Sequence, residues 1–258
     1  MEKFCYSIED EETLLFDLPK SNGLHIKGVL RGDLSQPLAV IMHGRPGTGN
    51  ELLPYLAAHY LHENNIASLR LFMYDFEPKT RNLLDCTLDT FANDFDEVIR
   101  QLRQRNVPKI FGIGHSYGGI TILKAKAILD AAVLWDPTHG SYWIEHANEQ
   151  DENFPEKIID DLVIGLGGYG YVSSVKTNKY DNQMGDTTEW AANKGYPLMV
   201  ASAGKGAMTH LGEQYIAVAD EPKKHIIIEN AHHQLEDSDK VILQLLKQTN
   251  DWLQKFTS

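Results

Sequence analysis

A glycine-rich turn between an apolar run and a helix-like segment constrains the fold of this chain more than any other feature. The turn spans residues 114–119 (GHSYGG), follows the apolar residues 110–113 and precedes a helix expected over residues 120–129. In a strand–turn–helix unit, the pattern G-x-S-x-G strains the serine backbone and exposes its hydroxyl at the carboxyl end of a sheet. Side chains at the two flanking glycines would crowd this turn. The pattern predicts a nucleophilic serine at position 116.

A second turn, residues 43–49 (HGRPGTG), ends an apolar run of buried-strand type at residues 38–42. The transition state of acyl transfer carries negative charge on the former carbonyl oxygen, which two backbone N–H donors can stabilise. One donor is expected from Tyr117, directly after the serine, and the other from the loop after an earlier strand. Arg45 stands where that second donor is expected. Taken alone, the loop is equally typical of a surface turn.

With these motifs, the chain resembles the α/β-hydrolase family over nearly its whole length. Residues 43–47 resemble the oxyanion loop of the family, residues 114–119 its nucleophile turn, and residues 231–234 (AHHQ) the loop that carries its histidine. The resemblance implies a mostly parallel sheet with helices on both faces. It also implies His233 as the catalytic base, because the family histidine precedes a short apolar-helical continuation. His232 is the alternative.

The acid that orients the histidine departs from the common family pattern. Its usual position follows the next-to-last strand, expected here at residues 197–201, but residues 202–208 (SAGKGAM) contain no carboxylate. Asp136 ends the strand expected at residues 131–135, which places it at the same sheet edge as the serine. We therefore predict Asp136 as the acid. The competing interpretation is a strand-terminating Asp-Pro turn, and the competing acids are Glu213 and Asp186.

The remaining pattern alternates strands and helices, as in an α/β fold with a mostly parallel sheet. Between residues 137 and 195 the alternation stops, and we predict a small lid there, inserted into a hydrolase core of residues 1–136 and 196–258. A match to G-x-G-x-x-G at residues 165–170 precedes no apolar-periodic helix, so it does not predict a dinucleotide site. Further strands are expected near residues 4–8, 13–18, 25–30, 66–74 and 224–228, and helices over residues 51–63, 88–105 and 241–256.

Charge and cysteine content limit the partners. With 24 Lys and Arg against 36 Asp and Glu, the net charge of −12 argues against binding to nucleic acid or to an anionic membrane. The two cysteines, Cys5 and Cys86, are interpreted as free thiols in a reducing compartment, and the acidic N-terminus is unlike a signal peptide, so a cytoplasmic location is expected. No histidine and cysteine spacing indicates a metal, and no cofactor is predicted.

These patterns predict a serine hydrolase that cleaves a small carboxylic ester through an acyl-enzyme on Ser116. The partner is then a small-molecule ester or other acyl compound, and the sequence does not predict an oligomeric state. The alternatives are a thioesterase, an aminopeptidase or a carbon–carbon bond hydrolase on the same scaffold. A non-enzymatic ligand-binding protein that retains the fold is a further alternative, favoured by the missing acid at the usual position.

Overall fold

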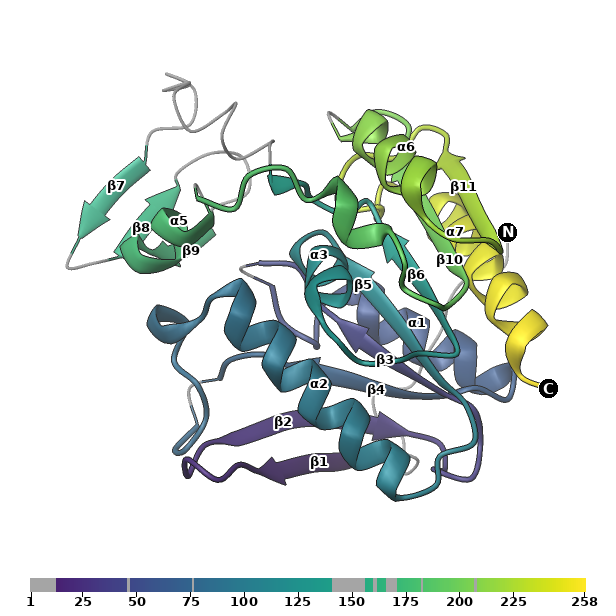
Figure 1. Cartoon of the computed structure of the whole chain (residues 1–258), viewed down its shortest axis with the longest axis horizontal. Coiled ribbons are helices and arrows are strands. Elements are labelled where there is room, and N and C mark those ends of the chain that lie inside the picture. Colours follow the sequence, from purple (N-terminus) through teal and green to yellow (C-terminus); the bar gives the residue numbers. More distant parts are fainter. Residues whose placement is uncertain are drawn as a thin grey trace.

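An eight-stranded sheet forms the centre of the molecule, in the order β1-β2-β4-β3-β5-β6-β10-β11 (Figure 1). The computed structural model describes residues 13–45, 47–75, 77–140, 156–159, 162–165, 171–181, 183–206 and 208–258. The strands of this sheet are β1 (Thr13–Pro19), β2 (His25–Arg31), β3 (Leu38–Met42), β4 (Ala67–Phe72), β5 (Ile110–His115), β6 (Ala131–Trp135), β10 (Leu198–Ala203) and β11 (Lys223–Ile228).

The two halves of the sheet differ in strand direction. At one edge β1 pairs antiparallel with β2, and β2 pairs antiparallel with β4. From β4 onward every pairing is parallel. Because the carboxyl ends of parallel strands meet at one edge of a sheet, the segments after β3, β5, β6, β10 and β11 converge there. The strand expected near residues 4–8 lies outside the described residues.

Helices cover both faces of the sheet (Figure 1). One hydrophobic cluster joins the sheet to α2, α3 and α6, and a second joins the opposite face to α1 and α7. The helices of these two layers are α1 (Leu52–Glu63), α2 (Leu88–Gln104), α3 (Tyr117–Lys124), α6 (Thr209–Val218) and α7 (Asp239–Leu253). Three short 3-10 helices are η1 (Leu83–Asp85), η2 (Thr188–Ala191) and η3 (Gln254–Phe256). Among the described residues, no helix is both long and apolar enough to traverse a lipid bilayer.

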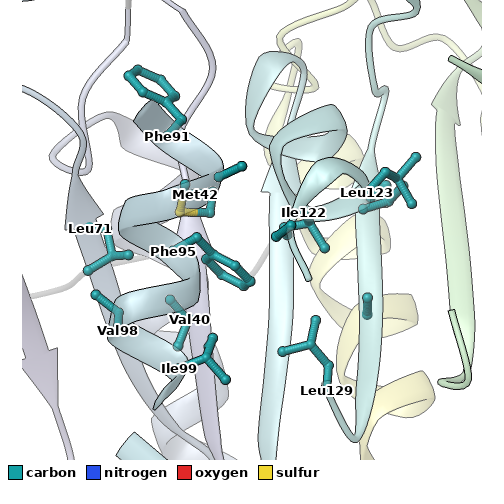
Figure 2. Close-up of a cluster of buried hydrophobic side chains, with 14 of the residues drawn as sticks. Val40, Met42, Leu71, Phe91, Phe95, Val98, Ile99, Ile122, Leu123 and Leu129 are labelled. Carbon is teal, nitrogen blue, oxygen red and sulfur yellow. The ribbon is translucent and has the colours of Figure 1, made fainter. Parts of the chain in front are cut away.

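Helix α2 illustrates how the apolar pattern produces this layer. The apolar residues of one face, which form a stripe at helical spacing, are buried, and Figure 2 shows Val98 beside Val40 of β3 and Leu71 of β4. The helix begins at a capping box, in which Thr87 and Thr90 each accept a backbone N–H of the other. Such a box satisfies N–H groups that the first helical turn leaves without partners. Pattern and cap together fix α2 close to the predicted bounds.

Two expectations about this layer were wrong. The helix predicted over residues 120–129 is α3, which begins earlier and ends at Lys124. The chain leaves the helix because Asp96 of α2 accepts the backbone N–H groups of Lys126 and Ala127. Asp94 and Asp96 lie off the apolar stripe of α2, a position that predicts solvated surface charges, but Asp96 is not one. Neither is Asp94, which is only 3% exposed and pairs with Arg81 and Lys20.

The segment predicted as a lid contains a second, three-stranded antiparallel sheet. Its strands are β7 (Glu156–Ile159), β8 (Leu162–Gly165) and β9 (Tyr171–Ser174), and α5 (Val175–Asp181) follows. In Figure 1 this small sheet lies apart from the eight-stranded one. Helix α5 contacts the η1 region, and Thr177 of α5 donates a hydrogen bond to the carbonyl of Cys86. Cys86 is a buried free thiol, and Cys5 lies outside the described residues.

Candidate active site

The turn after β5 gives Ser116 a strained backbone. β5 ends at His115, α3 begins at Tyr117, and Ser116 between them has φ 53° and ψ −117°. This left-handed region is sparsely populated by residues with a side chain. The flanking glycines have no space for a Cβ atom. A Cβ on Gly114 would lie 2.5 Å from the carbonyl oxygen of Gly118, and a Cβ on Gly118 would lie 2.4 Å from the carbonyl oxygen of Met42. The turn therefore needs glycine at both positions, as the pattern predicts.

Three of the candidate side chains form one chain of hydrogen bonds. Nε2 of His233 lies 2.9 Å from Oγ of Ser116, and Nδ1 of His233 lies 2.7 Å from Oδ2 of Asp136. A carboxylate only accepts hydrogen bonds, so Nδ1 of the neutral imidazole carries the proton and Nε2 accepts the hydroxyl of Ser116. This is the tautomer in which the imidazole can remove the proton of the serine.

Asp136 is completely buried at the carboxyl end of β6. Its second carboxylate oxygen, Oδ1, accepts the backbone N–H of Ala203 at 3.0 Å, and its own N–H donates to the carbonyl of Ala201 at 2.7 Å. Both partners belong to β10, the neighbouring strand. Asp136 also has a positive φ of 41°. The carboxylate is thus held on both oxygens, and its backbone adopts an unfavourable conformation.

The alternative residues lie elsewhere. Nδ1 of His232 contacts Asp237 at 2.5 Å, and the side chain of His232 is 61% exposed. Asp186 lies 3.1 Å from Nε2 of His139. Glu213 is on α6, where its charge acts on His225 and raises the pKa of that imidazole against the larger lowering effect of burial. The structure therefore brings His233 and Asp136, not these residues, to Ser116.

The loop after β3 passes close to the serine. A Cβ atom on Gly44 would lie 3.2 Å from Cβ of Ser116, and the guanidinium carbon of Arg45 lies 4.8 Å from the ring centroid of Tyr117. The two predicted oxyanion donors, the N–H groups of Arg45 and Tyr117, thus belong to backbone segments that lie side by side. Further along the loop, the hydroxyl of Tyr74 donates to the carbonyl of Gly47 at 2.6 Å.

Two buried histidines that the motif analysis did not single out support these loops. His43 donates through Nδ1 to the carbonyl of Gly44 at 2.7 Å and accepts the N–H of Met73 at Nε2. Nε2 of His115 contacts the carbonyl of His233 at 2.9 Å. Burial lowers the pKa of both imidazoles to about 4, so both are neutral at pH 7. The only signal in the sequence was their position, one directly after β3 and one directly before Ser116.

The described residues contain no group of three His, Cys, Asp or Glu side chains that could hold a metal ion. Residues 166–170, which carry most of the G-x-G-x-x-G match, lie outside the described part of the chain. The candidate site brings together a serine hydroxyl, an imidazole and a carboxylate. Its arrangement can move a proton from a serine hydroxyl to an imidazole whose second nitrogen faces a carboxylate.

Comparison with known proteins gives the fold a name. No family model matches the chain, and no curated protein matches it. Among solved structures, Est1E from Butyrivibrio proteoclasticus, determined with bound ferulic acid, has a TM-score of 0.73 at 17% identity, over 92% of this chain and 97% of that one. The mouse alpha/beta hydrolase domain-containing protein 10 has a TM-score of 0.73 at 14% identity, over 94% of this chain and 99% of that one.

An esterase domain from Rhodothermus marinus is similar to the same degree, with a TM-score of 0.70 at 16% identity over 95% of this chain and 99% of that one. Identities this low establish the fold and nothing finer. The chain has the α/β-hydrolase fold, which confirms the fold predicted from its sequence.

Proposed function

We propose that this protein is a serine hydrolase that cleaves small carboxylic esters. The observation that carries the proposal is the continuous hydrogen-bond chain from Ser116 through His233 to the buried carboxylate of Asp136. It coincides with a positive φ at the serine, the conformation expected of a nucleophile held at a turn. A serine that served only as a helix cap would need neither the strain nor the imidazole.

In the proposed mechanism, Oγ of Ser116 attacks the acyl carbonyl while Nε2 of His233 takes its proton. The backbone N–H groups of Tyr117 and Arg45 hold the negative oxygen of the tetrahedral intermediate. His233 then gives the proton to the departing alcohol oxygen, which leaves an acyl-enzyme. Water repeats the same steps: it loses a proton to His233, attacks the acyl carbon and releases the carboxylic acid and free Ser116.

Asp136 is assigned two roles in these steps. Its carboxylate keeps the proton of neutral His233 on Nδ1 and stabilises the imidazolium that forms during each transfer. The main argument for a non-catalytic protein was the missing acid after the next-to-last strand. Asp136 supplies a carboxylate from the neighbouring strand, so that argument loses its weight.

The proposed substrate is a small ester with an apolar acyl or alcohol group. The fold neighbours named esterases make this class the first to test, and the ferulic acid in Est1E makes a feruloyl ester a rational member of the panel. Residues 137–195 are rich in aromatic side chains, a composition that favours an apolar substrate group, but the described ones contribute little to this choice. Trp190 and Tyr180 pack against the hydrophobic core on the α2 face of the sheet.

Labelling with a fluorophosphonate probe tests the proposal without knowledge of the natural substrate. The wild-type protein should label at one serine and hydrolyse p-nitrophenyl acetate, and Ser116→Ala should lose both reactions. Ser202→Ala is a matched control, because Ser202 also lies 2.9 Å from a histidine nitrogen, that of His225, but is fully buried on β10. Labelling that persists in folded Ser116→Ala, or disappears in Ser202→Ala alone, would contradict the proposal.

A further inference from the structure

The four residues after Asp136 are attached to the rest of the protein at nearly every position. Pro137 packs against Gly119, where an added Cβ would lie 2.8 Å from Cβ of Pro137. The N–H of Thr138 donates to the carbonyl of Ser116 at 3.3 Å. Because Asp136 itself has a positive φ of 41°, its backbone keeps this conformation only while its surroundings impose it.

Two buried hydroxyl groups complete these attachments. The N–H of Gly140 donates to Oγ1 of Thr187 at 3.0 Å, Thr187 lies 2.6 Å from the hydroxyl of Tyr215, and Tyr215 donates to the carbonyl of Thr138 at 2.8 Å. The chain has one consistent direction: since Tyr215 gives its proton to Thr138, Thr187 must donate to Tyr215. Thr187 and Tyr215 are both 0% exposed. Such buried, fully satisfied networks favour a single arrangement of the backbone that they join.

Resting on the proposed function, we propose that Tyr215 and Thr187 are positioning residues for the acid Asp136. They act by fixing the carbonyl of Thr138 and the N–H of Gly140, which keeps the strained backbone of Asp136 in place and its carboxylate aimed at His233. Gly140 lies near the start of the predicted lid, and Thr187 lies near its end, just before η2. Together with Tyr215 of α6, these contacts join both ends of the lid to the backbone that carries Asp136. A Cβ on Gly140 would lie 1.9 Å from the carbonyl oxygen of Gly185, so the two ends touch.

This assignment has a consequence for proton binding at His233. Among the described residues, the titratable groups that face its imidazole are Asp136 and His115. The ring centroids of His115 and His233 lie 5.1 Å apart. His115 is neutral because burial lowers its pKa to about 4, so the carboxylate of Asp136 is the group that stabilises the imidazolium. A carboxylate that is less well aimed stabilises it less. Loss of the hydroxyl chain should therefore weaken the hydrogen bond between Asp136 and Nδ1 of His233.

Tyr215→Phe and Thr187→Val test the assignment, because each removes a hydroxyl and keeps the size of the side chain. We expect kcat for p-nitrophenyl acetate to fall about tenfold, the effect of one buried hydrogen bond, with KM within about twofold. Thr187→Ser retains the hydroxyl and should restore wild-type behaviour. The matched control is Tyr196→Phe, since Tyr196 is 4% exposed and its hydroxyl has no hydrogen-bond partner among the described residues.

An NMR measurement of the Nδ1 proton of His233 makes the test independent of turnover, because its chemical shift reports the hydrogen bond to Asp136. If Tyr215→Phe moves this signal and Tyr196→Phe does not, the assignment stands even for a substrate that is hydrolysed slowly. A wild-type protein that neither labels nor turns over esters would refute the proposed function, while the NMR measurement would still decide this assignment. If Tyr215→Phe and Thr187→Val shift the melting temperature but leave the Nδ1 proton signal and kcat unchanged, the two hydroxyls only stabilise the fold and the assignment is wrong.

Discussion

Replacement of Asp136 by asparagine probes the candidate triad at its most constrained point. In the wild-type structure Oδ1 accepts the N–H of Ala203 at 3.0 Å and Oδ2 contacts Nδ1 of His233 at 2.7 Å, in a site with no solvent exposure. An asparagine has one carbonyl oxygen and one NH₂ group for these two partners. If NH₂ faced Ala203, two donors would meet in a buried site, at a cost of about 1–3 kcal/mol. The N–H of Ala203 therefore turns NH₂ towards His233.

This orientation imposes the wrong tautomer on the base. An NH₂ group that donates to Nδ1 leaves the proton of neutral His233 on Nε2. Nε2 faces the hydroxyl of Ser116, and once it carries a proton it cannot accept the proton of the serine. The imidazolium also loses its negative partner. In a serine triad, this change lowers kcat by about ten-thousandfold, which corresponds to about 5 kcal/mol at 1.36 kcal/mol for each factor of ten. The loss is much larger than the cost of a buried hydrogen bond alone.

The assay is kcat/KM for p-nitrophenyl acetate together with the rate of fluorophosphonate labelling, both measured on folded protein at pH 7. Asp237→Asn is the matched control, because Asp237 holds the neighbouring His232 at 2.5 Å in the same type of contact. We expect the control to stay within about twofold of wild type, since truncation of exposed contacts has small effects. Asp136→Asn with more than a tenth of wild-type activity, or a control that loses as much, would refute the reasoning.

Three further predictions follow from other contacts. His233→Ala should lose about as much activity as Ser116→Ala, because triad members act as a unit, and His232→Ala should keep most of it; the reverse result in ester turnover would move the base by one residue. Burial lowers the pKa of His115 to about 4 from 6.5, so the free energy of unfolding should fall as the pH drops from about 6.5 towards 4, where the unfolded state binds the proton first. Urea unfolding should show a smaller fall for His115→Gln, and an identical fall would exclude this cause. Asp94→Asn should lower the unfolding free energy by about 3 kcal/mol, because it leaves the side chain of Arg81 without its carboxylate in a largely buried site; a loss below about 1 kcal/mol in urea would show that the pair is not coupled.

The parts of the fold that could be predicted are those fixed by local pattern. The apolar runs of the eight-stranded sheet and the stripe of α2 carry their own period, and the described elements begin and end close to the expected residues. The end of α3 could not be found in this way, because it depends on a carboxylate from another helix, Asp96, that accepts the N–H groups of residues 126–127. Helix α6 was not predicted at all, since its buried residues are few and include Gly212.

Within the candidate site, chain order and motif selected Ser116 and Asp136, and the family resemblance selected His233 over His232. The structure brings these three predicted side chains together. No pattern could show that His232 points to Asp237 while His233 points to Asp136, because both histidines share one loop. That difference depends on where the sheet delivers Asp136, a non-local property of the fold. The roles of His43 and His115 were likewise hidden, since a buried neutral histidine has no sequence signature that distinguishes it from an exposed one.

The position of Asp136 also explains the composition of the loop after β10. β6 and β10 are adjacent and parallel, so a carboxylate at the end of either strand reaches the same point beside the histidine. With Asp136 there, Ala203 at the end of β10 contributes its N–H, and in the loop after β10 a Cβ on Gly206 would lie only 3.4 Å from Oδ2 of Asp136. A second carboxylate in that loop would place two negative charges together in a buried site, which is strongly unfavourable. A loop after β10 without a carboxylate is therefore compatible with the proposed triad, in which Asp136 at the end of β6 is the acid.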